Sequence, residues 1–234
     1  MGLQHVLFTR EGGFLLYGAV CGAAFGAARI GKRTGLRFSR VMDEITLPGL
    51  SAILLCRLGE GFAHEGLGTW VEDERYWRFP FAVQNAYGEY QWALFLLEAL
   101  YALFMILFLR SWYAPSNKKD GIALSALLLY AAAQICFESL RTDSSLKIGF
   151  VRVSQVLSAA AILFVILIRN RKSKRALMWR ILLCALCYGG IGAAEWALDK
   201  TEISAFALYA AMLILCFILV WAGHSKTRPQ RKAA

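Results

Sequence analysis

The sequence predicts an all-α, polytopic membrane helix bundle with about seven transmembrane helices. Hydrophobic residues make up 58% of its 234 residues, and the mean hydropathy is +0.49. Runs of about 18 or more apolar residues are typical of helices that span a membrane. Seven such runs are expected at 13–30, 42–58, 92–109, 121–137, 150–168, 178–197 and 203–222. The whole chain, 1–234, is therefore expected to form a single integral membrane domain.

The second of these runs is the weakest, because it contains Pro48 and only a short apolar core. Proline removes a backbone hydrogen bond and kinks helices. Backbone polar groups within a bilayer must be satisfied internally. This segment is therefore expected to be either a kinked helix or a partly re-entrant loop that the protein shelters.

The distribution of charge predicts which side of the membrane each loop occupies. The net charge of +10 would suit nucleic acid, but 18 of the 26 Lys and Arg lie in segments 29–40, 110–120, 169–180 and 223–234. The segments that alternate with them, 1–13, 57–91, 138–152 and 198–202, hold 11 of the 16 Asp and Glu. Basic loops stay cytoplasmic. This alternation excludes a nucleic-acid partner as the reason for the charge and predicts an N-terminus outside and a basic cytoplasmic tail, 223–234.

No metal or other cofactor is expected. All six cysteines fall within the predicted spans, and only Cys184 and Cys187 have the spacing of a redox or metal pair. In the middle of an apolar helix, that pattern is typical of small buried thiols. No cluster with metal-ligand spacing is evident elsewhere.

A polar, glycine-rich run, Arg57 to Gly68, directly follows the second span. Glycine lets the backbone turn sharply and approach a ligand closely. Arginine stays charged and forks onto phosphate with two parallel hydrogen bonds. The run therefore indicates a lipid-headgroup site. The rest of segment 57–91 is rich in aromatic residues, which favour the membrane interface, so this segment is expected to form a small extracytoplasmic head on the bilayer surface.

Polar residues also line the apolar helices on single faces. Gln91 and Glu98 are seven residues apart, and an ionisable group such as Glu98 inside an apolar run should have a partner. One stripe on the fourth span, at spacings of four, four and three, contains Tyr130, Gln134, Glu138 and Arg141. Gln155, three residues after Arg152, extends the same pattern to the fifth span. These residues predict either interhelical hydrogen bonds or a polar cavity open to the outer leaflet.

Between about Gly12 and Ile168, several segments occur in the same order as the motifs of a known family. This part of the chain resembles prolipoprotein diacylglyceryl transferase, the membrane enzyme that lipidates bacterial lipoproteins. Arg57 to Gly68 aligns without gaps on the family signature RIGNFINGExxG. Flanking segments resemble the family motifs GGxSFHGG, HPxQLYEALLEG, YxxFRFxxEFFR and MGQxLS. The matching residues are Arg57, Glu65, Gly68, Gln91, Tyr130, Glu138, Arg141 and Gln155.

Several family positions carry other residues. Tyr17 replaces the histidine of the first motif, and Glu60 replaces the signature asparagine. His64 replaces the glycine before the signature glutamate, Gly88 replaces the histidine of HPxQ, and Gln134 replaces an arginine. Two helices that begin the family's chains have no counterpart before Gly12, whereas two helices follow the region of resemblance.

The resemblance implies an enzyme of the bacterial cell membrane. It implies transfer of the diacylglyceryl group of phosphatidylglycerol to the cysteine thiol of a prolipoprotein lipobox peptide. The chemistry needs a base for the thiol and an anion clamp for the leaving phosphate. Because the usual histidine is absent, the candidate bases are Glu65, His64, Tyr17 and Glu60. The implied substrate-binding residues are Arg57, Arg141, Tyr130, Glu138, Gln134, Gln91 and Gln155.

Two other functions fit the same residues. The first is a non-catalytic lipid-binding or accessory homologue, which the replaced histidine and arginine favour. The second is a small membrane transporter with a polar central cavity. No internal repeat is obvious in the sequence, which argues weakly against a transporter.

The charge pattern makes a direct topological prediction. We expect segment 57–91 outside the cell and the tail from Gly223 inside, because basic loops stay cytoplasmic. Reporter fusions, or labelling of cysteines introduced into each loop, would check this in intact cells. A cytoplasmic 57–91 segment would contradict both the topology and the proposed headgroup site.

Overall fold

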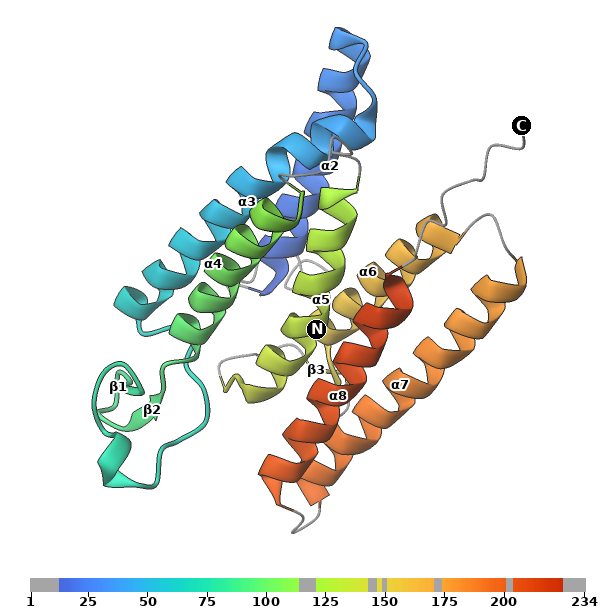
Figure 1. Cartoon of the computed structure of the whole chain (residues 1–234). Helices are drawn as coiled ribbons and strands as arrows, with labels where there is room; N and C mark the ends of the chain where they lie inside the picture. Colours follow the sequence, from blue (N-terminus) through green and yellow to red (C-terminus); the bar gives the residue numbers. More distant parts are fainter. Residues whose placement is uncertain are drawn as a thin grey trace. The chain divides into compact units, whose positions relative to one another are not determined.

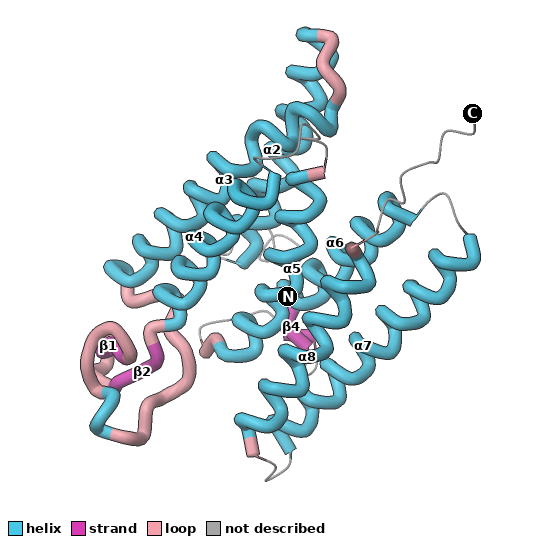
Figure 2. Tube along the Cα trace, viewed as in Figure 1, coloured by secondary structure: helices cyan, strands magenta, loops and turns pink. Residues whose placement is uncertain are grey.

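The computed structural model describes residues 13–113, 121–142, 147–148, 151–170, 174–200 and 204–224. These residues form seven α-helices and four short strands (Figures 1 and 2). The helices are α2 (Gly13–Thr34), α3 (Phe38–Glu60), α4 (Leu94–Tyr113), α5 (Ile122–Leu140), α6 (Val153–Asn170), α7 (Lys174–Lys200) and α8 (Ala205–Gly223). The strands are β1 (Ala82–Gln84), β2 (Tyr90–Trp92), β3 (Lys147–Ile148) and β4 (Val151–Arg152). All but the first two residues of the predicted basic tail lie outside the described residues.

Five of the described helices are long and apolar enough to cross a membrane. They comprise Leu94–Trp112, Ile122–Leu140, Val153–Asn170, Lys174–Leu198 and Ala205–Gly223. The fold is therefore an all-α membrane protein, as predicted. The remaining two helices, α2 and α3, have 22 and 23 residues, so they are long enough to span but less apolar. That they also cross the membrane, giving seven spans, stays a prediction.

The weakest predicted span is helical throughout. Pro48 lies inside α3, which runs without a break from Phe38 to Glu60. A partly re-entrant loop is therefore excluded for this segment. The helix ends at Glu60, two residues beyond the predicted span, and Arg57 lies in its last turn.

The chain divides into two compact units, which are described separately. The first comprises residues 1–126 and 137–157, and the second comprises residues 127–136 and 158–234. In the first unit, α3 packs against both α2 and α4 (Figure 1). In the second unit, α7 packs against α8. A buried face of α8 with helical spacing carries Met212, Cys216 and Leu219.

A buried carboxylate of α3 holds the start of α5 within the first unit. Asp43 is 6% exposed, and its two carboxylate oxygens accept hydrogen bonds from the backbone N–H groups of Gly121 and Ala123, at 2.9 and 2.7 Å. The first N–H groups of a helix have no partner within the helix. Asp43 therefore caps α5 from a distant part of the chain and fixes where that helix begins.

A small head connects α3 to α4. After two 3-10 turns, Gly61–Ala63 and Glu74–Tyr76, strands β1 and β2 pair antiparallel, with Val83 opposite Gln91. The Asn85 side chain closes their turn by accepting from the N–H groups of Tyr87 and Glu89. The head starts at the C-terminal end of α3 and leads into the N-terminal end of α4. Because these two helices pack together, the head stays close to the residues at those two ends.

Replacing Asp43 should weaken the fold measurably. Asp43→Ala leaves two backbone donors at the start of α5 without their acceptor, and losing a helix cap costs about 0.5–2 kcal/mol. The neighbouring Glu44 is exposed, so Glu44→Ala provides a matched control. Thermal unfolding of the purified protein in detergent would measure both variants. An equal midpoint for the two would show that the cap contributes nothing to stability.

Candidate functional site

The last turn of α3 directs a buried arginine at two carboxylates. The Arg57 side chain is 7% exposed. Its Nη1 lies 2.5 Å from Glu60 Oε1, and its Nε lies 2.6 Å from Glu98 Oε2. Glu60 is three residues further along the same helix, a spacing that places the two side chains side by side. Glu98 comes from the second turn of α4, which packs against α3.

A second buried arginine reaches the same two carboxylates from the end of α5. Arg141 is the C-terminal cap residue of α5, and its Nη2 lies 3.0 Å from Glu60 Oε2. Its Nη1 lies 3.8 Å from Glu98 Oε1. Arg57, Glu60, Glu98 and Arg141 thus form one closed set of ion pairs, which we call the arginine–glutamate cluster. The partner expected for Glu98 is confirmed to be this pair of arginines.

Two positive and two negative charges balance within the cluster. Three of its side chains are at most 8% exposed, whereas Glu60 is 18% exposed. An unpaired buried charge is strongly destabilising, and mutual pairing removes that penalty. Glu138 is also buried and lies close enough to Glu98 for the two carboxylates to interact. The arginines therefore converge, as a phosphate clamp requires, but carboxylates of the protein already contact them.

The glycine-rich loop after α3 ties three helix ends together through its backbone. The Gly66 carbonyl accepts from the N–H of Phe95 in the first turn of α4, at 2.8 Å. The Leu67 carbonyl accepts from the N–H of Thr142, just after Arg141, at 3.2 Å. The Gly68 N–H donates to the carbonyl of Trp92 at 2.9 Å. Residues 66–68 therefore hold the elements that carry Glu98 and Arg141 in register with the end of α3.

Gly66 is required by both its conformation and its surroundings. Its φ of +67° lies in the left-handed region, which other residues rarely adopt. A Cβ atom at this position would lie 2.5 Å from Glu60 Oε2 and 3.2 Å from Arg141 Nη2. The absent side chain leaves room for the Glu60 carboxylate and for the guanidinium beside it.

The remaining residues predicted to bind substrate lie at different places. Gln91 is buried in β2, where its strand continues toward α4, and it forms an isolated bridge with Trp70. Gln155 is buried at the start of α6, and its Oε1 accepts from the Arg152 N–H at 3.0 Å. Tyr130 and Gln134 share a face of α5 with Glu138 but lie within the second unit. Their contribution to the site stays a prediction.

The four candidate bases occupy different environments. Glu60 belongs to the arginine–glutamate cluster, and Glu65 is exposed on the loop that follows. The Tyr17 hydroxyl, on α2, donates to the Ser154 carbonyl at the start of α6, at 3.1 Å. His64 is exposed, and its Nδ1 lies 3.1 Å from the Gln84 carbonyl oxygen. Of the four, Glu60 is the one that contacts the arginines.

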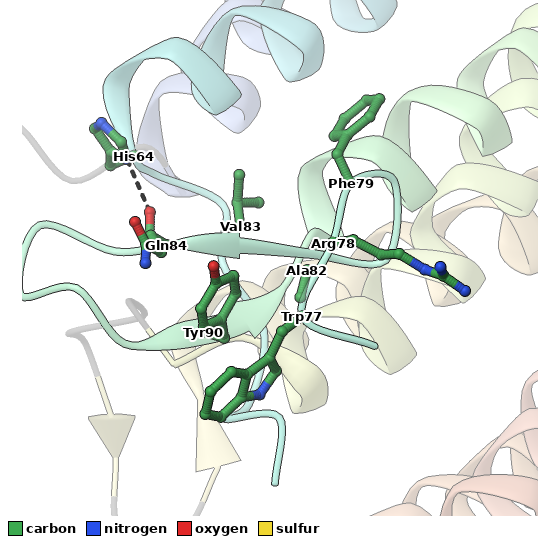
Figure 3. A pocket seen from close by; sticks show the side chains of 8 residues that line it. All are labelled: His64, Trp77, Arg78, Phe79, Ala82, Val83, Gln84 and Tyr90. Atoms are coloured by element: carbon green, nitrogen blue, oxygen red, sulfur yellow. Dashed lines mark hydrogen bonds between the residues drawn. The ribbon is translucent and has the colours of Figure 1, made fainter. Parts of the chain in front are cut away.

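His64 belongs to an open pocket on the head (Figure 3). The pocket has a volume of about 310 Å³. Its other lining residues are Trp77, Arg78, Phe79, Ala82, Val83, Gln84 and Tyr90. Trp77 stacks on Tyr90 with ring centroids 4.9 Å apart, and its indole N–H donates to the Val71 carbonyl. Aromatic rings and one cationic side chain therefore line the same pocket as His64, in a setting unlike that of the cluster.

Sequence reasoning found the arginines and missed how Glu60 is used. It treated Glu60 as a candidate base at the position of the family's asparagine. The available signal was the three-residue spacing between Arg57 and Glu60, which pairs side chains if the segment is helical. The predicted span ends at residue 58, which places Glu60 in the predicted loop, so the sequence does not show that the two side chains share a helix. Among the described residues, no group of three or more His, Cys, Asp or Glu is arranged to hold a metal ion.

The fold and the site together define a multi-pass membrane protein with a buried ionic cluster where its helices meet a small head. A family model described as prolipoprotein diacylglyceryl transferase matches residues 2–170. The chain belongs to the prolipoprotein diacylglyceryl transferase family. The match confirms the resemblance predicted from the motifs. Together with the membrane-spanning helices, it makes the chain a multi-pass protein of the cell membrane.

Several similar curated proteins from Clostridium species carry the name phosphatidylglycerol–prolipoprotein diacylglyceryl transferase. The protein of Clostridium novyi (strain NT) is 29% identical over 168 residues, which cover 70% of this chain and 65% of the relative. That of Clostridium botulinum (strain Hall) is 31% identical, covering 69% and 64%. The chain thus spans just under two thirds of the length of these relatives. No solved structure matches it significantly.

The packing around Gly66 can be tested by adding one methyl group. Gly66→Ala should destabilise the protein by more than the ~1–3 kcal/mol that a strained backbone conformation costs, because the new Cβ also collides with Glu60 and Phe95. Gly88→Ala is the matched control, since Gly88 has φ +84° but no atom within 4 Å of an added Cβ. Thermal unfolding would compare the variants. An equal loss of stability in the two variants would mean that backbone strain alone, and not the collision with Glu60 and Phe95, destabilises Gly66→Ala.

Proposed function

We propose that this protein is a phosphatidylglycerol–prolipoprotein diacylglyceryl transferase. In the proposed reaction, the cysteine thiolate of a lipobox peptide attacks phosphatidylglycerol at the carbon of the diacylated glycerol that is bonded to the phosphate oxygen. A carbon–sulfur bond forms, the carbon–oxygen bond to the phosphate breaks, and glycerol phosphate leaves. The thiol proton passes to a base of the protein. The membership of the family and the names of the relatives support this reaction class.

One observation supports the proposal from the site itself, namely the convergence of Arg57 and Arg141 from two different helices. Two guanidinium groups that meet at one point suit an oxygen anion, because each presents parallel N–H donors. As the carbon–oxygen bond breaks, negative charge accumulates on the leaving phosphate. Donors already fixed in place stabilise that charge most effectively.

The substrates would meet at the membrane interface. The arginine–glutamate cluster lies where α3 ends and α4 begins, next to the head. We propose that this end of the helices faces outward, in line with the charge alternation along the sequence. A phosphatidylglycerol headgroup in the outer leaflet and a prolipoprotein anchored in the same membrane would then reach the cluster together. Exposed aromatic side chains on the head suit that interface.

A non-catalytic lipid-binding homologue is the second candidate. The observation that favours it is the hydrogen bond of Tyr17, at the position of the family's histidine, to a backbone carbonyl. A phenol held in this way is a poor proton acceptor near neutral pH. The deciding assay is transfer from phosphatidylglycerol to a lipobox peptide in nanodiscs, supported by complementation of a bacterium depleted of its own transferase. Lipid binding without transfer would establish the accessory function.

Arg57→Lys should weaken phosphatidylglycerol binding despite keeping the positive charge. Lysine cannot reproduce the fork of parallel N–H donors with which Arg57 would hold a phosphate, and losing one hydrogen bond to a charged group reduces binding roughly tenfold or more. Arg75→Lys is the matched control, because the Arg75 side chain is 88% exposed on the head. Binding to nanodiscs with and without phosphatidylglycerol would measure the effect. Unchanged binding by Arg57→Lys would remove Arg57 from the clamp.

Substitution of the catalytic base should lower the rate of diacylglyceryl transfer. Glu65 and His64 are our first choices, and removal of a catalytic proton acceptor typically slows turnover ~100- to 10,000-fold. Glu65→Gln or His64→Gln should therefore cut the transfer rate that deeply while lipid binding persists. If transfer is unaffected by both substitutions, the base is Glu60 or Tyr17, and the same assay on Glu60→Gln and Tyr17→Phe would separate those two.

A further inference from the structure

Glu60 occupies the place in the cluster that a ligand anion would need. Its two carboxylate oxygens each contact a different arginine, Oε1 to Arg57 at 2.5 Å and Oε2 to Arg141 at 3.0 Å. A phosphate held between the same two guanidinium groups would use the same donors. The family signature has a neutral asparagine at this position, so the acidic side chain is a property of this chain.

The two glutamates of the cluster differ in their ability to move. Glu98 is 2% exposed and lies in the second turn of α4, so that its carboxylate has almost no access to solvent. Glu60 is 18% exposed and is the last residue of α3, next to a turn. Of the two carboxylates, Glu60 alone can swing toward solvent without being buried elsewhere.

An exchange of anions would leave the charge of the cluster unchanged. A phosphodiester carries one negative charge, as does a carboxylate. If Glu60 left with nothing in its place, the two buried arginines would lose one of the two carboxylates that contact them, which is unfavourable. If a phosphodiester entered as Glu60 left, two negative charges would still face two positive charges. Without a ligand, the packing therefore favours Glu60 between the two arginines. When a phosphodiester is present, it can take the place of Glu60.

We propose that Glu60 is a specificity-determining residue, an internal anion that holds the place of the phosphate between Arg57 and Arg141 and is displaced when a phosphate ligand binds. This inference rests on the proposed function insofar as the arginines form a phosphate clamp. It goes further by assigning to Glu60 a competing role that the asparagine of the family signature cannot have. A phosphodiester therefore binds more weakly to this site than the two arginines alone would allow.

The test is phosphate binding by variants that remove the competing charge. Glu60→Gln keeps the shape of the side chain, and Glu60→Asn supplies the residue of the family signature. Glu72→Gln removes the same charge from an exposed position on the head and is the matched control. Isothermal titration of the purified, full-length protein in detergent would use glycerophosphoglycerol, a soluble phosphodiester with one negative charge, and, separately, inorganic phosphate. Nanodiscs of phosphatidylglycerol, compared with phosphatidylcholine, would distinguish a lipid headgroup from a free phosphate.

We expect Glu60→Gln and Glu60→Asn to bind the phosphate probes about tenfold more tightly than the parent protein, the change in equilibrium that one hydrogen bond to a charged group produces. Glu72→Gln should bind as the parent does. Unchanged or weaker binding by both Glu60 variants, with their thermal unfolding midpoints preserved, would overturn the proposal. It would mean that Glu60 organises the arginines and does not compete with phosphate.

The outcome is independent of catalysis. Tighter phosphate binding by the Glu60 variants, together with no transfer by any form of the protein, would support the internal anion and refute the transferase. Transfer by the parent protein, with phosphate binding unaffected at Glu60, would support the transferase and refute the internal anion. Absence of phosphate binding by all the variants would refute both the clamp and the internal anion.

Discussion

Charge neutrality among buried groups is the constraint on which the rest of the first unit depends. Arg57 and Arg141 come from different helices, and each would be strongly destabilising if it were buried alone. Glu60 and Glu98 neutralise them, and this requires the end of α3, the start of α4 and the end of α5 to meet at one point. The cluster is thus both a structural junction and the place where a ligand anion would bind.

The loop that follows α3 makes this junction possible through its backbone. Residues 66–68 supply hydrogen-bond partners to the backbone near the beginning of α4 and just beyond the end of α5, where groups would otherwise have no partner within a helix. Gly66 also leaves space for the Glu60 carboxylate. Gly66, which lies at a variable position of the signature, is therefore explained by its packing within the first unit.

This chain departs from the family pattern at two positions that bear directly on its chemistry. Glu60 adds a negative charge where the signature has a neutral amide, and its carboxylate contacts both arginines. Tyr17 replaces an imidazole with a phenol whose hydroxyl donates to a backbone carbonyl. Under the proposed function, the first change would act on the binding of the phosphate, whereas the second would act on the removal of the thiol proton. The two changes therefore act on separate steps of the proposed reaction.

The sequence by itself determined the membrane-embedded, all-α class, because apolar runs longer than 18 residues have few other stable structures. It also identified Arg57, Arg141 and the need of Glu98 for a partner, since isolated charges in apolar helices are costly. Only the tertiary structure showed that α3 continues through Glu60, that Asp43 caps α5, and that Glu60 bridges both arginines. These features depend on contacts between residues as much as 81 positions apart, which helical periodicity cannot reveal.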